Sequence, residues 1–363
     1  DSVPPLAFAP GVNLSYKNAV VIASGVTFDI TAKQVGDYAY CLCGNQLLSL
    51  TKGLLPAYIF IDGPGNVIEG TGSIWGPITL QTPDTELIWR GEGYMINSLN
   101  MNGGTITLQN KMNFRANGAI TGPGTINLGV STLVLSEKES RLEPPVNFIG
   151  QTGKVEFREK LSLSSTSTFQ GVCIVEGHGG VLDLGENAGL VVADNSTLRL
   201  RDMTIWGVNA NKIRCLTDSG KIELNNVRLV QDDTYRFDTG SMLFINNVTF
   251  SGGFVFSYES KLTSTIDSYA TLKFDQGTTC SLSRAHLDDT VGPIMYKDST
   301  SALIFDDSTL FVHTNGAKFT KGTVYCYRDF TIDVISTSSS NGLIMGDGTP
   351  EGDMTFQFMP GSA

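Results

Sequence analysis

The feature that most constrains the fold of this chain is a short phrase that recurs along its second half. Its pattern is apolar-x-apolar-x-polar-turn-x-apolar, and it reads "LRLRDMTIWG" (198–207), "IELNNVRLV" (222–230), "LFINNVTFSGG" (243–253) and "LIFDDSTLFV" (303–312). Apolar residues at every second position predict a strand with one buried face. The Asn or Asp that interrupts each phrase tolerates the left-handed backbone of a sharp bend, after which a second strand begins.

A second version of the repeat occupies the first half of the chain. "GTITL" (104–108) recurs as "GTINL" (124–128), and "DGPGNVIEG" (62–70) is echoed by "TGPGTINLG" (121–129). Short strands, sharp bends and a period of about 20 to 30 residues are typical of a β-solenoid, in which each coil is one rung. The repeat therefore predicts an all-β fold, a parallel β-helix with irregular rungs.

Two other all-β folds also contain many short strands, but neither fits this spacing. β-Sandwiches show hairpin turns between longer alternating runs. Propeller blades repeat at about 40 residues or more. Neither fold explains a repeat of about 20 residues that bends in the middle of a strand.

The repeat also predicts which side chains face the interior and which occupy the bends. The apolar residues expected to point into the tube are Leu198, Leu200, Ile222, Leu224, Leu243, Ile245, Leu303 and Phe305. Polar residues at equivalent bends are expected to stack as an asparagine-type ladder, in which each side chain bonds the one below. The predicted ladder residues are Asp202, Asn226, Asn247 and Asp307.

The phrases "STLRLRDMTIWG", "GKIELNNVRL" and "SMLFINNVTFSGG" resemble the coils of secreted bacterial β-helix surface proteins, in the broad class of pectin-lyase-like solenoids. The resemblance covers about residues 60–335, is one of coil pattern, and implies a right-handed parallel β-helix. The class includes polysaccharide lyases and hydrolases, phage tailspikes, adhesins and autotransporter passengers. No catalytic motif of any one enzyme family stands out, so no catalytic residue is carried over.

Charge and hydropathy argue against several classes of partner. The 363 residues include 25 basic and 36 acidic ones, a net charge of −11, and we find no basic cluster of the kind that nucleic acids or anionic membrane surfaces require. No apolar run reaches the roughly 18 residues that a membrane span needs. The opening "DSVPPLAF" predicts a mature N-terminus left by signal-peptide cleavage, and hence an extracellular or cell-surface location. A trimmed chain is the alternative.

The six cysteines are Cys41, Cys43, Cys173, Cys215, Cys280 and Cys326. An even number in a secreted chain suggests disulfides, but the spacing argues against most of them. Cys41 and Cys43 are two residues apart on a predicted strand, about 6.6 Å between Cα atoms with parallel Cβ vectors, which is poor geometry for a bond. The others are separated by two or three coils, beyond the limit of about 7 Å. We therefore favour small core residues, and without a CxxC pair or a neighbouring His we expect no metal site and no cofactor.

The segment with the most catalytic character is "SRAHLDDT" (283–290), which brings Arg284, His286, Asp288 and Asp289 close together in sequence. A polysaccharide hydrolase needs paired carboxylates on one face, and a lyase needs a base. Acidic residues at the corners of coils also cap turns and keep the surface soluble. We favour this second interpretation, and the four residues stay weak candidates.

Two further sets of residues bear on glycans. Sequons for N-glycosylation occur at Asn13, Asn195 and Asn247, and they matter only if the source glycosylates its proteins. The tryptophans, which are Trp75, Trp89 and Trp206, each follow an apolar strand residue and are expected to pack.

The two ends of the chain show no clear helical cap. A parallel solenoid exposes unpaired backbone groups at its first and last coils, which free proteins cover, often with a helix. The predicted organisation is an extended N-terminal arm at 1–16, a capping region at 17–60 and the solenoid at 61–363, ending in a strand. The apolar residues of the two ends that we expect to drive assembly are Val3, Leu6, Phe8, Val12, Leu14, Met354, Phe356 and Phe358.

These ends lead to the functional expectation. Head-to-tail contacts that do not close give filaments, and strand addition supplies the bonding. We expect a secreted structural protein whose main partner is itself and which self-assembles end to end into an extracellular fibre or surface layer. The alternative is a carbohydrate-active enzyme, or a tailspike-like or adhesin-like glycan binder, with a groove on one solenoid face.

Overall fold

The computed structural model of the chain describes residues 6–7, 20–22, 27–30, 38–50, 54–55, 57–95, 97–114, 119–136, 138–210, 212–282, 293–313, 316–335, 342–346, 349–350 and 354–360. The regular structure there consists of β-strands that pair in parallel, as a β-solenoid of about 12 turns. The predicted all-β parallel solenoid is confirmed. The chain divides into two compact units, Asp1–Gly180 and Val181–Ala363. Within the described residues, we find no helix of the length and apolarity that crossing a membrane requires.

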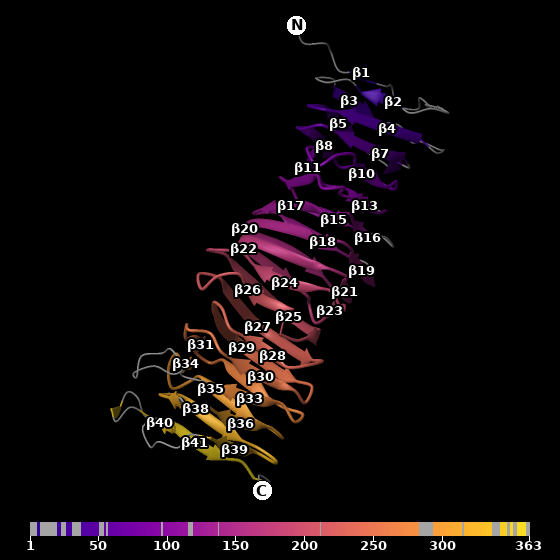
Figure 1. Cartoon of the computed structure of the whole chain (residues 1–363). Helices are drawn as coiled ribbons and strands as arrows, with labels where there is room; N and C mark the ends of the chain where they lie inside the picture. The colour runs from indigo at the N-terminus through magenta and orange to yellow at the C-terminus, as the bar shows by residue number, and fades with distance from the viewer. Residues whose placement is uncertain are drawn as a thin grey trace. The chain divides into compact units, whose positions relative to one another are not determined.

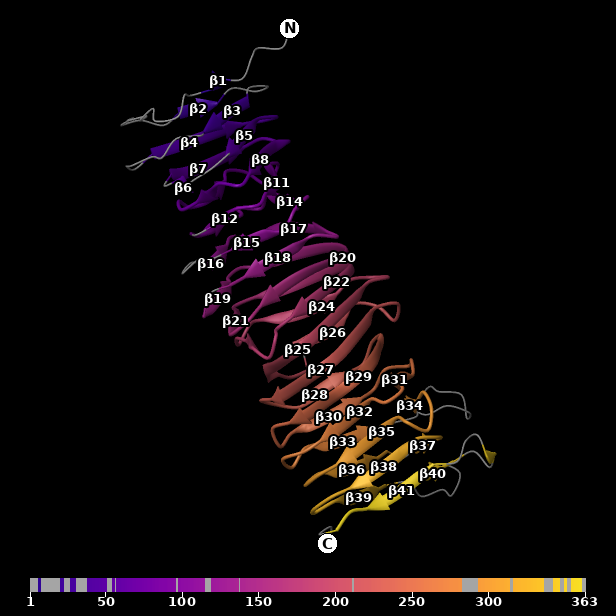
Figure 2. The same ribbon diagram turned by 180° about the vertical axis from the view of Figure 1, so that it is seen from behind.

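The first unit stacks its coils into three columns of parallel strands (Figure 1). The first column contains β3 (Thr27–Ile30), β5 (Leu47–Leu50), β8 (Asn66–Gly70), β11 (Glu86–Gly91), β14 (Thr105–Leu108), β17 (Gly124–Gly129), β20 (Val146–Phe157) and β22 (Thr166–Glu176), with β1 (Leu6–Ala7) beside β3. The second contains β6 (Leu54–Leu55), β9 (Ser73–Ile74), β12 (Tyr94–Met95), β15 (Met112–Phe114) and β18 (Thr132–Leu135). The third contains β2 (Val20–Ile22), β4 (Tyr38–Cys43), β7 (Ala57–Asp62), β10 (Ile78–Leu80), β13 (Leu99–Asn100), β16 (Ala119–Thr121), β19 (Glu139–Leu142) and β21 (Lys160–Leu163). Figure 2 shows the first column from behind, where β8, β11, β14 and β17 follow one another.

The repeated phrases of the first half form the rungs of this unit. Thr105 pairs with Thr125 and Ile106 with Ile126, so "GTITL" lies directly beside "GTINL" in the ladder. The two isoleucines point inward and are 0% and 2% exposed. Strands from the predicted capping region at 17–60 pair in the same columns, as β5 does with β8.

The second unit is also built from columns of parallel strands. Its first column contains β23 (Val181–Leu184), β25 (Thr197–Val208), β27 (Lys221–Gln231), β29 (Ser241–Ser251), β32 (Thr271–Phe274), β35 (Ala302–Phe305), β38 (Thr323–Cys326) and β41 (Thr355–Phe358). A second contains β28 (Tyr235–Phe237), β30 (Val255–Tyr258), β33 (Thr279–Leu282), β36 (Thr309–Val312) and β39 (Thr331–Val334). The remaining strands pair as β24 (Gly189–Val192) with β26 (Ile213–Cys215), β31 (Ser264–Ile266) with β34 (Ile294–Tyr296), and β37 (Ala317–Phe319) with β40 (Leu343–Met345).

The interior of the second unit is filled by the apolar residues of the repeat. Six of the eight predicted residues are buried at 0% exposure: Leu198, Leu200, Ile222, Leu224, Leu303 and Phe305. The prediction is wrong for Leu243 and Ile245, because Met242 and Phe244 occupy the interior positions of β29. Four consecutive apolar residues, 242–245, give no alternation from which to choose a face, and the bend of β29 holds one residue more than that of β27.

The cysteines divide into two groups, and all six are free thiols. Cys173, Cys215, Cys280 and Cys326 are buried core residues, as predicted. Cys41 and Cys43 are not core residues, because they alternate with the inward-facing Tyr40 and Leu42 on β4 and so point outward.

Candidate functional site

The predicted catalytic segment lies outside the described residues, so the structure places none of Arg284, His286, Asp288 and Asp289. The nearest described histidine, His313, has its Nε2 atom 2.8 Å from Oγ of Ser281. A Ser–His hydrogen bond is the starting geometry of nucleophilic catalysis, which also needs access for a substrate and a third group that orients the base. Ser281 is 4% exposed, and the aromatic ring of Phe311 packs edge-on against His313 at 5.0 Å between ring centroids. We therefore interpret the hydrogen bond between Ser281 and His313 as a structural contact.

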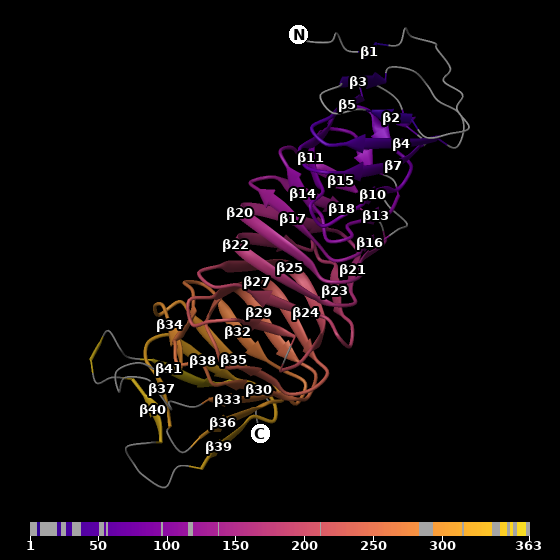
Figure 3. The ribbon, with the colours of Figure 1, turned by 45° about the horizontal axis from the view of Figure 1, so that its top comes forward.

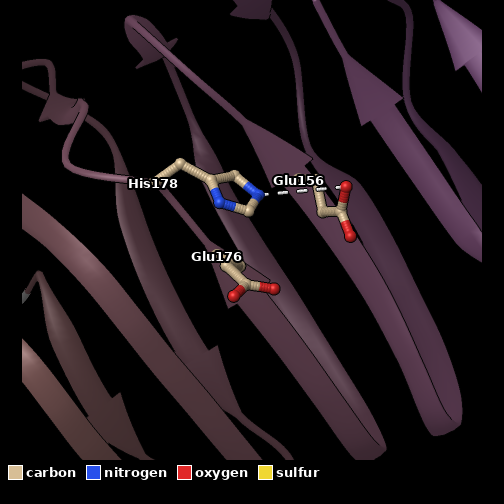
Figure 4. A group of neighbouring side chains, drawn as sticks. All are labelled: Glu156, Glu176 and His178. Carbon is tan, nitrogen blue, oxygen red and sulfur yellow. Dashed lines mark ion pairs between the residues drawn. The ribbon is translucent and has the colours of Figure 1, made fainter.

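The clearest cluster of titratable side chains lies where β20 and β22 run side by side. Glu156 of β20 pairs in register with Glu176 of β22, and both carboxylates point outward beside His178 in the following turn (Figure 4). His178 Nε2 lies 3.9 Å from a carboxylate oxygen of Glu156, and the potential ligand atoms of the three residues lie within 4.8 Å of one another. This geometry meets the distance requirement of a metal site.

Lys154 argues against a metal in this cluster. Its ammonium lies 2.6 Å from Glu176 and 3.1 Å from Glu156, so it already pairs with both carboxylates. The hydrogen bond to Glu176 is the main reason that the pKa of Lys154 is raised above its ordinary value. A metal ion would have to displace this ammonium to reach both glutamates. We therefore interpret the cluster as an ion-pair network on the face of the first unit and assign no metal to it.

A second charged network crosses three coils of the second unit. Lys273 Nζ lies 2.8 Å from Asp306 and 3.8 Å from Asp275, and Arg328 lies 3.4 Å from Asp306. The hydrogen bond from Lys273 is the main cause of a lowered pKa at Asp306, whereas burial raises the pKa of Asp275. Two carboxyls with opposite pKa shifts can serve as acid and base. Here each is held by a cation of the same network, which is the arrangement of a structural ion pair.

The predicted ladder residues occupy bends, with one shift in position. Asp202, Asn226 and Asp307 adopt left-handed backbone with φ between 50° and 53°. In β29 the left-handed residue is Asn246 (φ 54°) and not the predicted Asn247. The cause is the extra residue in the bend of β29, which also shifted the interior positions of this strand by one.

The side chains at these bends bond from coil to coil. Asn226 Nδ2 donates to Asp202 Oδ1 at 2.9 Å, and Asn226 Oδ1 accepts from the backbone N–H of Asn247 at 3.3 Å. Asn246 Nδ2 donates to Asn225 Oδ1 at 2.8 Å. All these bonds lie at the exposed surface, so the ladder fixes the bend and does not fill the interior.

We expect Asn226→Leu to lower the free energy of unfolding by about 1–2 kcal/mol, because a leucine in left-handed backbone is strained by that amount. Asn226→Gly is the matched control, since glycine adopts this backbone freely and loses only the side-chain bonds; its loss should stay below about 1 kcal/mol. Urea unfolding curves of the two variants and the wild type measure the effect. An unchanged midpoint for the leucine variant would contradict the role of the bend.

The last coil of the second unit exposes apolar side chains that the sequence pattern did not predict to be open. Figure 3 shows β36 beside β39 and β37 beside β40, and β41 lies against β38. Ile332 and Val334 are in register with Leu310 and Val312, which are 0% exposed, yet they are themselves 38% and 39% exposed. They occupy interior positions that no described residue covers.

The same mismatch occurs on the other strands of this coil. Phe358 is in register with the fully buried Cys326 but is 66% exposed, and Met345 is in register with the fully buried Phe319 but is 43% exposed. Of the predicted C-terminal assembly residues, Phe356 and Phe358 lie on this surface with ring centroids 5.3 Å apart, and Met354 immediately precedes β41. We call Ile332, Val334, Met345, Phe356 and Phe358 the terminal surface. Ile332, Val334 and Met345 are not among the predicted assembly residues; the alternation in "TIDV" marks the first two as interior positions and gives no sign that they are open.

The predicted N-terminal assembly residues are only partly described. Leu6 lies in β1, which pairs with β3 of the same chain. Val3, Phe8, Val12 and Leu14 lie outside the described residues.

Two of the three tryptophans do not pack as expected. Trp89 is fully buried, but Trp75 is 54% and Trp206 is 47% exposed. Tyr94 of the first unit is 37% exposed, and its backbone N–H donates to Oγ of Ser73, which lies two residues before Trp75 in the sequence. Exposed aromatic rings of this kind can stack on sugars, a role that the alternative function would need.

Comparison with protein-family models, with curated proteins and with solved structures gives no match for this chain.

Proposed function

We propose that this protein is a secreted structural protein whose copies stack end to end into an extracellular fibre or surface layer. The observation that carries the proposal is the terminal surface, where side chains at interior positions of the solenoid lie open. Each of these side chains would be buried by one further coil. Burying a fully exposed apolar side chain contributes about 1.5–3 kcal/mol. Four of these side chains are 38–66% exposed and Phe356 is half-buried, so each contributes a fraction of that value, and together they favour association.

The occupant that we propose for the terminal surface is the first coil of a second copy. Among the described strands, β39, β40 and β41 each have a neighbour on one side only. A parallel strand added at the usual spacing of about 4.8 Å would satisfy the open backbone groups and cover the side chains in one step. Because the contact joins two different surfaces of the same chain, it repeats without closing and gives a filament.

The extracellular location is part of the proposal. It is supported by the resemblance of the coil phrases to secreted β-helix surface proteins of the pectin-lyase-like class. In a fibre or surface layer the acidic net charge of −11 would keep the lateral faces of neighbouring copies apart.

We expect Phe358→Asp to weaken the association of copies by at least about a hundredfold, because the contact would lose an apolar side chain and gain a buried carboxylate. Sedimentation velocity over a range of concentrations, together with negative-stain images, measures the assembly. Val130→Asp is the matched control, since Val130 is 73% exposed outside the terminal surface and should assemble as the wild type does.

Two outcomes would contradict the proposal. The wild type would stay monomeric at high concentration, or Phe358→Asp would form the same fibres as the control. Far-ultraviolet circular dichroism of each variant checks that the solenoid is still folded, so that a loss of assembly is not a loss of fold.

The second candidate function is glycan binding, and the exposed rings of Trp75 and Trp206 are the observation that favours it. Single rods in negative stain, combined with a signal on a glycan array that Trp75→Ala abolishes, would support it over assembly. A reducing-sugar assay distinguishes a glycan binder from an enzyme that cleaves the glycan.

A further inference from the structure

The two outward-facing cysteines of β4 bring their sulfur atoms together. Sγ of Cys41 and Sγ of Cys43 lie 3.3 Å apart, and both are thiols. Tyr40 and Leu42, which alternate with them, are 1% and 0% exposed and hold the strand to the interior. The strand therefore presents two thiols on one face, already in contact.

The neighbours of the two thiols make them unequal. Cys41 lies opposite Phe60 of β7 and is half-buried, whereas Cys43 lies opposite Asp62 and is exposed. Burial is the main cause that raises the pKa of Cys41 to about 11, and the contact with Cys43 adds to it. Because the thiolate is the reactive form and needs access, Cys43 is the thiol that meets a reagent first.

We propose that Cys41 and Cys43 form a reversible thiol pair, which a small-molecule disulfide such as oxidised glutathione converts into an intrastrand disulfide. In the first step the Cys43 thiolate attacks one sulfur of glutathione disulfide, and one glutathione leaves as its thiolate. In the second step Cys41 loses its proton to water and attacks the Cys43 sulfur, which releases the second glutathione. In total, two protein thiols lose two protons and two electrons, and one glutathione disulfide is reduced to two glutathione thiols.

The spacing of the pair determines what kind of disulfide it forms. Residues two apart on a strand are separated by about 6.6 Å between Cα atoms, close to the upper end of the range that disulfides span, about 4.4–6.8 Å. Their parallel Cβ vectors hold the Cβ atoms farther apart than the roughly 3.5–4.5 Å of a relaxed disulfide, so the bond forms only with a local distortion of β4. A bond at this limit is strained, and strained exposed disulfides are reduced easily. The bond is thus suited to reversible oxidation, and not to permanent stabilisation of the coil.

The experiment uses the full-length folded protein and glutathione disulfide. After incubation, the protein is denatured, its remaining thiols are alkylated, and it is cleaved after Lys33 and Lys52 to release the peptide 34–52, which contains both cysteines. We expect this peptide to be lighter than the reduced, unalkylated peptide by two hydrogen atoms and to carry no alkyl group. Treatment with a dithiol reductant should restore both alkylation sites. The four buried cysteines serve as an internal control and should be fully alkylated.

Two single variants test the order of the steps. Cys41→Ser should stop after the first step and keep a stable glutathione adduct on Cys43. Cys43→Ser should form its adduct on Cys41 more slowly, because that thiol is half-buried. The proposal is overturned if the wild-type peptide keeps two alkylatable thiols at a glutathione disulfide concentration that modifies Cys41→Ser, or if it carries a separate glutathione on each cysteine.

Discussion

Phe250→Ala is expected to lower the free energy of unfolding by about 3–5 kcal/mol, the usual range for removing a buried phenylalanine. The Phe250 ring is fully buried in the second unit, where its centroid lies 4.3 Å from that of Phe256 and 5.4 Å from that of Phe274. The stack continues from Phe274 to Phe305 at 5.7 Å. Removing one ring would leave a cavity in a column of in-register aromatic side chains, which the flanking backbone ladders prevent from collapsing.

Phe254→Ala is the matched control for this prediction. Phe254 is 38% exposed, so the same substitution should change the stability by less than about 1 kcal/mol. Urea unfolding measures both variants, provided that the slope of the transition stays constant. Equal shifts of the two midpoints would show that the aromatic column contributes nothing special to the second unit.

Lys212→Met is expected to lower the free energy of unfolding by about 2–4 kcal/mol, because it would leave buried carbonyl groups without a donor. Lys212 is 5% exposed, and its ammonium donates to the carbonyl oxygens of Leu184, at 3.2 Å, and of Gly185. Methionine has a similar length but no donor, so it fills the space and removes only the hydrogen bonds and the charge.

Lys221→Met provides the matched control on the same unit. The Lys221 side chain is 39% exposed and pairs with Glu223 at 3.0 Å. Glu223 keeps a second cation, Arg199, at 2.8 Å, so the loss of Lys221 should change the stability by less than about 1 kcal/mol. Thermal melts followed by circular dichroism compare the two variants. A higher melting temperature for Lys212→Met would mean that desolvation of the buried ammonium outweighs its hydrogen bonds, and the prediction would then be wrong.

The repeat was enough to predict the fold, because side-chain alternation and the left-handed bend are local properties. Leu198, Leu200 and Asp202 stand in a phrase where apolar and polar residues alternate clearly, and the structure places them as expected. The prediction failed by one residue at Asn247, where "MLFI" offers an apolar residue at every position. There the register is set by the pairing of β29 with β27, which the local pattern does not contain.

The candidate sites depended more on the tertiary structure. The cysteines at 41 and 43 were expected in the core, and only the burial of Tyr40 and Leu42, which alternate with them on β4, shows that they point outward. The sequence pattern did not predict the burial of Lys212, since a single lysine in a loop resembles any surface residue. Its burial follows from the carbonyls of a turn that lies far from it along the chain.

By itself, the sequence determined the all-β parallel solenoid, the approximate length of each coil, most interior positions and the chemistry of the bends. These properties repeat along the chain and depend on contacts between a residue and its equivalent one coil away. The tertiary structure alone decided which side chains at interior positions remain open, because Ile332 and Val334 read as ordinary core residues in the sequence. Their exposure results from the absence of a described strand over β39, and a sequence pattern describes each coil without recording whether another coil covers it.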